Sequence, residues 1–323
     1  MADTDDVRTF NFTGVPEGPG IEPIQTAEQA IAVEGQRRLI FTGPSPHGWH
    51  RLSVFLRCPS LYAYVYRSPG MTESLASTDY LTRGTLVHVG LAHHYLRRGI
   101  VERKGLLHAG QTERNQEDFY TPLAAVALAA QRLASEGDRW AMPLLGLAQA
   151  IVNGYLRTVA ATSIDRGFKV YAVEEIATLT CGGFPYTARF DLVAEDSVGL
   201  TAIDHKVLAR PKNAAAMYSH SGQIHGHRML GAHLWGPKFR GVQLNAISAD
   251  PTNSGIHRVV PHAAPGQVTA MPQLVFDVHS QINALDSSRP WHAWPRTMAC
   301  LDRFEGRCPS WDRCTGLAPA NPT

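Results

Sequence analysis

Apolar and polar positions alternate with two different periods along this chain. Over about residues 49–99 and 121–166, apolar side chains recur three or four positions apart, which is the spacing of amphipathic helices, and residues 100–120 between them are polar and are expected to form a loop or insertion. Over 168–207, short apolar runs alternate with polar positions between tight turns, which predicts a meander of three antiparallel strands. The pattern then predicts a helix over 212–235, two strands within 241–262 and a closing helix over 266–285.

Local signals divide the helical half of the chain. In "WHRLSVFLRCPSLYAYVYR", Ser53 is expected to cap a helix and Pro59 to interrupt it. The stretch "RGTLVHVGLAHHYLRRG" predicts a second helix that opens at Gly84. The Ala- and Leu-rich residues 121–166 predict two further helices that break near Pro143.

This order of elements favours one α/β domain with a helical N-terminal half over two separate domains. Residues 1–38 are expected to form an irregular leader, because "GVPEGPGIEP" is too rich in Gly and Pro for a regular element. Residues 39–323 are then expected to form the domain. It carries a helical insertion at about 100–166 and an aromatic, cysteine-rich tail at about 290–316.

Composition and charge restrict the expected cellular location of the protein but do not indicate a binding partner. The formal net charge of +2 gives no general argument for nucleic acid or a membrane surface, although a local basic groove is compatible with it. No apolar stretch is long enough to span a bilayer, and the acidic start "MADTDDVRTFNF" does not resemble a signal peptide. A cytoplasmic location is therefore expected, with the five cysteines as free thiols, metal ligands or nucleophiles rather than disulfides.

The stretch "ARFDLVAEDSVGLTAIDHKV" carries the candidate chemistry. Asp191 lies in one apolar run, and Asp204 and Lys206 lie in the next. A buried carboxylate is costly unless a metal or a counter-ion compensates it. Strand alternation places Asp204 and Lys206 on one face and His205 on the other. Two carboxylates on neighbouring strands and an amine predict a Mg²⁺ or Mn²⁺ site with a cationic helper.

These residue types suit the hydrolysis of a phosphodiester bond. Carboxylates hold a divalent ion, the ion activates a water molecule, and a cation orients that water or stabilises the developing charge. Lys206 is the candidate for positioning the water, and Lys is rare here, at only five of the 30 basic positions. Glu174 lies on the preceding predicted strand and could add a carboxylate, whereas the adjacent Glu175 points the other way.

The same motifs resemble the D…(D/E)xK signature of PD-(D/E)xK nucleases, and their surroundings resemble the RecB-like exonuclease branch. That branch has a "GTxxH" element, here "GTLVH", and a carboxylate on the first strand. It also has a "GxxD" strand, here "ARFD", a "DxK" element, here "DHK", and a later helical glutamine. The matching positions are, in chain order, His88, Glu174, Asp191, Asp204, Lys206 and Gln223. Three departures are Ala188 for the family glycine, Val207 for its threonine and His227 for its tyrosine.

This resemblance implies a restriction-endonuclease-like core, with a mixed β-sheet flanked by helices. It also implies a metal ion held by His88, Asp191 and Asp204, and hydrolysis of DNA ends, with single strands preferred. The setting would be DNA repair or recombination, phage DNA metabolism or CRISPR-type adaptation. Because no GxxxxGK[ST] pattern is present, the protein would work alone or with a helicase or recombination partner in trans.

Four of the cysteines resemble the iron–sulfur subset of this branch, which includes AddB-type and CRISPR-associated small RecB-like exonucleases. These cysteines are Cys58, Cys300, Cys308 and Cys314. The resemblance implies a [4Fe–4S] cluster that joins the N-terminal helices to the C-terminal tail, and Zn²⁺ in a Cys₄ site is the alternative. Cys181 lacks cysteine neighbours in the sequence and is expected to be an ordinary buried or turn residue.

Two alternatives stay open from the sequence. The chain could keep the nuclease fold as a non-catalytic factor that binds DNA ends or assembles a complex. The tyrosines of "LYAYVYR", Tyr62, Tyr64 and Tyr66, could stack on a DNA strand or could pack in the core.

Overall fold

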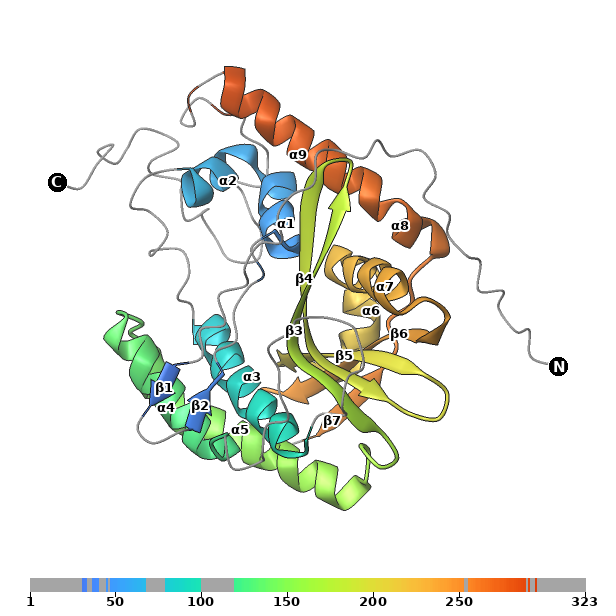
Figure 1. Cartoon of the computed structure of the whole chain (residues 1–323). Helices are drawn as coiled ribbons and strands as arrows, with labels where there is room; N and C mark the ends of the chain where they lie inside the picture. The colour runs from blue at the N-terminus through green and yellow to red at the C-terminus, as the bar shows by residue number, and fades with distance from the viewer. Residues whose placement is uncertain are drawn as a thin grey trace.

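A computed structural model gives the fold of most of the chain. It describes residues 31–33, 37–40, 45, 47–67, 79–99, 119–252, 255–288, 290 and 294. Within these residues, a five-stranded sheet with the order β3-β4-β5-β6-β7 lies between two groups of helices (Figure 1). This arrangement confirms the predicted α/β fold with a mixed sheet flanked by helices.

The strands of this sheet follow the predicted pattern. Their bounds are Lys169–Cys181 for β3, Phe184–Glu195 for β4, Leu200–Leu208 for β5, Phe239–Ser248 for β6 and Ile256–Val259 for β7. β3, β4 and β5 form the predicted antiparallel meander, β6 pairs with β5 in parallel, and β7 pairs with β6 antiparallel. The β3–β4 hairpin extends well beyond the part of the sheet that β5, β6 and β7 form (Figure 1).

Three helices cover one face of the sheet, and they share a core with it. They are α3 (Asp79–Arg97), α4 (Pro122–Ser135) and α5 (Ala141–Thr162). Gly90 lets these helices approach closely, because a Cβ atom there would lie 2.8 Å from Val152 and 2.9 Å from Val126. One predicted boundary is wrong, because α3 begins before Gly84. The two helices predicted over 121–166 are present, and the break between α4 and α5 lies close to Pro143, which is in the first turn of α5, where no N–H partner is needed.

A second group of helices covers the opposite face. It consists of α1 (Trp49–Arg57), α2 (Pro59–Tyr66), α6 (Ala214–Tyr218), α7 (Gly222–Trp235), α8 (Pro265–Thr269) and α9 (Met271–Ser288). α7 lies close to β4, because a Cβ atom at Gly226 would overlap the hydroxyl of Tyr186. The single helix predicted over 212–235 is divided in the structure into the end of a 3₁₀ turn at Pro211–Asn213, then α6, then α7. A second 3₁₀ turn, Gly236–Lys238, follows α7.

Two further expectations differ from the structure near the start of the described residues. Ser53 does not cap α1, because that helix begins at Trp49 and the Ser53 hydroxyl donates to the carbonyl of His50. Residues 31–39, expected to be largely irregular leader, include the two short antiparallel strands β1 (Ile31–Val33) and β2 (Arg37–Leu39). No helix in the described part of the chain has the length and apolar character that a membrane span needs.

Candidate active site and metal centre

The site lies where two strands of the sheet separate. The ladder between β4 and β5 ends at the pair Leu192 and Ile203. Beyond that pair, β4 continues beside β3 while β5 continues beside β6. Asp191 and Asp204 are the first residues past the last pair, one on each strand. The fork therefore places two carboxylates at the point where β4 and β5 part.

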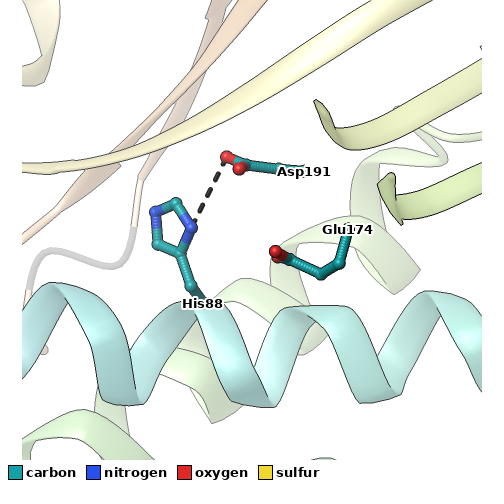
Figure 2. Close-up of side chains that lie close together, drawn as sticks. All are labelled: His88, Glu174 and Asp191. Atoms are coloured by element: carbon teal, nitrogen blue, oxygen red, sulfur yellow. Dashed lines mark ion pairs between the residues drawn. The ribbon is translucent and has the colours of Figure 1, made fainter. Parts of the chain in front are cut away.

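Three side chains from three elements meet at this fork. His88 of α3, Glu174 of β3 and Asp191 of β4 each offer one ligand atom, and these atoms all lie within 4.8 Å of one another. Figure 2 shows the imidazole rising from α3 toward the two carboxylates, with His88 Nδ1 3.5 Å from Asp191 Oδ2. Two carboxylates suit Mg²⁺ or Mn²⁺, and an imidazole is acceptable to Mn²⁺. This donor set fits a divalent cation.

Glu174 occupies a strained position in its strand. Its φ is 51°, in the left-handed region that costs a residue other than glycine about 1–3 kcal/mol. Such strain persists only where surrounding structure enforces it, and it is concentrated at functional sites. Burial raises the pKa of Glu174 well above its usual value, and the Asp191 charge raises it further, against the opposing effect of Arg189 at 3.5 Å. A bound cation would offset this cost.

Asp191 is oriented by the neighbouring strand. Its Oδ2 atom accepts a hydrogen bond of 2.7 Å from the main-chain N–H of His205. At the fork this N–H has no partner on β4, so the carboxylate takes the place of a ladder carbonyl. The side chain is 8% exposed, and its second oxygen is left for another ligand.

Asp204 and Lys206 form a second part of the site. Lys206 Nζ lies 2.7 Å from Asp204 Oδ2, in agreement with the predicted shared face of β5. Gln223 of α7 donates to Asp204 Oδ1 at 3.0 Å. Burial lowers the pKa of Lys206, but the charges of Asp204 and Asp191 outweigh this effect and raise it above its usual value. The amine is therefore held as an ammonium ion.

The predicted ligand set and the observed group differ in one member. We predicted His88, Asp191 and Asp204, whereas the group of three within the described residues contains Glu174 in place of Asp204. The Asp204 carboxylate instead faces Lys206 and Gln223. The two parts are close enough to interact electrostatically. The Asp204 charge raises the pKa of Glu174, and the Asp191 charge raises the pKa of Lys206.

The residue at the family tyrosine position, His227, is buried in the core. His227 is 3% exposed and packs on Phe190, with ring centroids 5.1 Å apart, and burial lowers its pKa. The sequence motifs gave no sign of Tyr218, whose ring centroid lies 5.9 Å from Lys206 Nζ. Tyr218 is the last residue of α6 and lies on a different element from Lys206, so a local pattern does not encode that contact.

The stacking candidates and the cysteines are placed only in part. Tyr62 and Tyr64 are buried, which favours core packing, while Tyr66 is partly exposed beneath Arg51, at 4.7 Å. Cys58 is buried between α1 and α2 beside Leu61. Cys300, Cys308 and Cys314 lie outside the described residues. Cys181 is buried, as expected, and burial raises its pKa to about 11.

Comparisons with known proteins identify the class. Residues 49–315 match the family model of the PD-(D/E)XK nuclease superfamily, and the chain belongs to that superfamily. Among solved structures, it is similar to a candidate exonuclease from Eubacterium rectale, at 11% identity and a TM-score of 0.49 over 86% of this chain and 90% of that one. No curated protein sequence matches the chain.

Proposed function

We propose that this protein is a divalent-metal-dependent deoxyribonuclease of the RecB-like type that degrades DNA from free ends, preferentially as single strands. The observation that carries the proposal is the meeting of His88, Glu174 and Asp191 within 4.8 Å, beside the ion pair of Lys206 and Asp204. A buried acidic group with a histidine and an adjacent ammonium is costly as a purely structural element. It is suited to holding a cation and a phosphate ester.

The chain's own residues divide the work between them. His88, Glu174 and Asp191 would hold Mg²⁺ or Mn²⁺, which supplies a polarised phosphate and a water of lowered pKa when it is bound. Lys206 is positioned to orient the attacking water and to stabilise charge on the phosphate. Gln223 restrains Asp204, so that this carboxylate stays beside the ammonium or turns toward the ion without leaving the site.

The arrangement of the motifs supports the proposed DNA substrate and the proposed RecB-like type. The six residues that resemble RecB-like motifs come from α3, β3, β4, β5 and α7, yet they surround one fork in the sheet. An inactive DNA-end-binding factor would not need to keep all of them, so we favour the enzyme over that alternative. A helicase or recombination partner would supply any unwinding in trans.

We also infer that the four cysteines Cys58, Cys300, Cys308 and Cys314 bind a [4Fe–4S] cluster, with Zn²⁺ as the alternative. A contact close to Cys58 supports this proposal. The Ser60 hydroxyl donates to the main-chain carbonyl of Trp294 at 2.6 Å, and the indole of Trp294 stacks on Tyr62. The chain that leads to the three C-terminal cysteines therefore passes within two residues of Cys58.

The test is hydrolysis of end-labelled single- and double-stranded DNA with Mg²⁺ or Mn²⁺. We expect the wild-type protein to release short products from single strands, and Asp191→Asn to release none. Asp196→Asn is the matched control, since Asp196 lies in the exposed turn between β4 and β5. DNA binding without cleavage by the wild-type protein in either metal would favour the end-binding alternative.

A further inference from the structure

A row of polar side chains, two buried and one partly buried, crosses the sheet behind the active site. His205, Asn245 and Arg258 lie on three adjacent strands and are direct register partners, His205 with Asn245 and Asn245 with Arg258. They occupy the face opposite Asp204 and Lys206, toward α3 and α5. His205 and Asn245 lie on interior strands, where such positions usually hold aliphatic side chains, and Arg258 lies on the edge strand β7.

The row is hydrogen-bonded along its length. Asn245 Nδ2 lies 3.2 Å from His205 Nδ1 and donates to the Tyr155 hydroxyl at 2.9 Å. Asn245 Oδ1 accepts a bond of 2.7 Å from Arg258 Nε. Arg258 in turn donates to Asp165 Oδ1 at 2.7 Å. Asn245 is 0% exposed, so these bonds replace those that water would otherwise supply.

The network closes on α3, the helix that carries His88. The Tyr95 hydroxyl donates to Asp165 Oδ2 at 2.8 Å and also bonds the hydroxyl of Tyr155. Tyr95 lies two helical turns after His88, on the same face of α3. The far end of the row is therefore fixed to the helix that presents a proposed metal ligand.

His205 connects this network to the site in two ways. Its ring stacks on Tyr95, with centroids 5.7 Å apart and planes at 10°, and meets the His88 ring edge-on at 6.0 Å. Its main-chain N–H holds Asp191 Oδ2 at 2.7 Å. One residue thus contacts two proposed ligands, and Asn245 holds the side chain of that residue.

We propose that Asn245, supported by Arg258, is a positioning residue for the metal centre. Asn245 holds the His205 ring in place. The held ring keeps the His205 N–H directed at Asp191 and keeps the His88 ring packed against it. Stability alone does not account for the row, because replacing buried polar partners with apolar side chains of similar shape is often neutral or stabilising. The proposal rests on the proposed function only in requiring that the centre bind a divalent cation.

The experiment uses the full-length protein and compares wild type with Asn245→Leu, which keeps the volume and removes the bonds. Calorimetric titration with Mn²⁺ in the absence of DNA is expected to show that the variant binds the ion about 10-fold more weakly, as for other residues that orient metal ligands. Nuclear magnetic resonance of the metal-free protein is expected to show faster hydrogen exchange at the His205 amide. Cleavage at low Mn²⁺ should fall, and excess Mn²⁺ should restore most of it.

Ile151→Ala is the matched control, because Ile151 lies in the same core on α5 and outside the row. It should lower the midpoint of thermal unfolding without changing Mn²⁺ affinity. Should Asn245→Leu fail to fold, Tyr155→Phe removes a single hydroxyl from the network and is expected to weaken Mn²⁺ binding in the same direction. Unchanged Mn²⁺ affinity in the folded variant, with wild type binding Mn²⁺, would overturn the positioning role. Metal binding without DNA cleavage would overturn only the proposed function.

Discussion

Lys206 Nζ lies 2.7 Å from Asp204 Oδ2, which is shorter than the 3.5 Å between His88 Nδ1 and Asp191 Oδ2. Without a cation, the ammonium is therefore the counter-ion of Asp204. An ion that recruits Asp204 must compete with this pairing. Lys206 thus has two effects on the site, since it neutralises one carboxylate and supplies a positive charge for the reacting phosphate.

Replacing Lys206 should separate metal binding from chemistry. In Lys206→Met, we expect the turnover number at saturating Mn²⁺ and DNA to fall about 100-fold or more, because the charge that stabilises the transition state is lost. Mn²⁺ affinity should be retained or should increase, because a competing cation leaves Asp204. Turnover assays and calorimetric titration measure the two quantities. Lys212→Met, at an exposed position of the 3₁₀ turn, is the control and should change neither.

Glu174 is expected to reduce stability in the absence of metal. Burial and the Asp191 charge raise its pKa, so folding opposes its ionised form at neutral pH. Glu174→Gln should therefore raise the midpoint of thermal unfolding of the metal-free protein, by about 1–2 °C for each kcal/mol gained. Because the ionised form is the cause, this gain should shrink as the pH falls toward the usual pKa of a glutamate, about 4.3.

The same variant should lose the response to metal. Mn²⁺ is expected to raise the unfolding midpoint of the wild-type protein and to leave that of Glu174→Gln nearly unchanged. Glu195→Gln, at the end of β4 beside the turn to β5 and away from the fork, is the control for a lost carboxylate charge. A lower midpoint in metal-free Glu174→Gln than in wild type would show that the pair with Arg189 outweighs the burial of the carboxylate.

Gln223 should act through the carboxylate that it contacts. Its amide donates to Asp204 Oδ1 at 3.0 Å, and Gln223→Glu would place an acceptor and a second negative charge there. We expect the turnover number to fall about 10-fold and its dependence on Mn²⁺ concentration to shift to higher values. Kinetics over a range of Mn²⁺ concentrations measure both effects. Gln273→Glu, on the exposed side of α9, should behave as wild type.

Local patterns were sufficient to predict the strands that carry the site. Period-two alternation placed Asp204 and Lys206 on one face, and their 2.7 Å contact agrees with that. The same alternation favoured Glu174 over Glu175, and Glu174 is the residue that approaches His88 and Asp191. These relationships follow from neighbouring residues on one strand, which is why the sequence alone was enough.

Relationships between distant residues could not be predicted in this way. The left-handed φ of Glu174 arises in a strand with no glycine or turn signal at that position. The contact of Asn245 with His205 spans 40 positions, and that of Arg258 with Asp165 spans 93. Their pairing depends on strand register and on helix packing, so the polar row became apparent only in three dimensions.

Histidines that are buried or partly buried away from the metal centre should make the fold sensitive to acid. Burial lowers the pKa of His50, His93, His94 and His279 to about 4 in each case. His93 accepts a hydrogen bond from the N–H of Ile40 at 3.0 Å and must be neutral to do so. An unfolded histidine binds a proton below about pH 6.5, so the unfolded state takes up more protons and the free energy of unfolding falls as the pH drops from 6.5 to 4.

For His93 this loss amounts to roughly 2 kcal/mol between pH 7 and pH 5. We expect His93→Gln, which retains an acceptor for Ile40, to reduce the pH dependence of the free energy of unfolding over that range. Urea denaturation at several pH values measures it. His262→Gln removes an exposed histidine and should leave the dependence unchanged. Equal slopes in His93→Gln and wild type would show that His93 is protonated in the folded protein.

The cysteine proposal predicts a coloured protein. Anaerobically purified wild type should show broad visible absorption that bleaches on reduction, with about four iron and four sulfide ions per chain. Cys58→Ser should lose this absorption and unfold at a lower temperature, because the link between α2 and the C-terminal segment is removed. Cys181→Ser should retain the colour, since Cys181 lies on β3. A colourless protein with one zinc ion per chain would replace the cluster by a Cys₄ zinc site. A protein without metal would overturn the cluster and leave the contacts of Trp294 with Ser60 and Tyr62 to hold this segment in place.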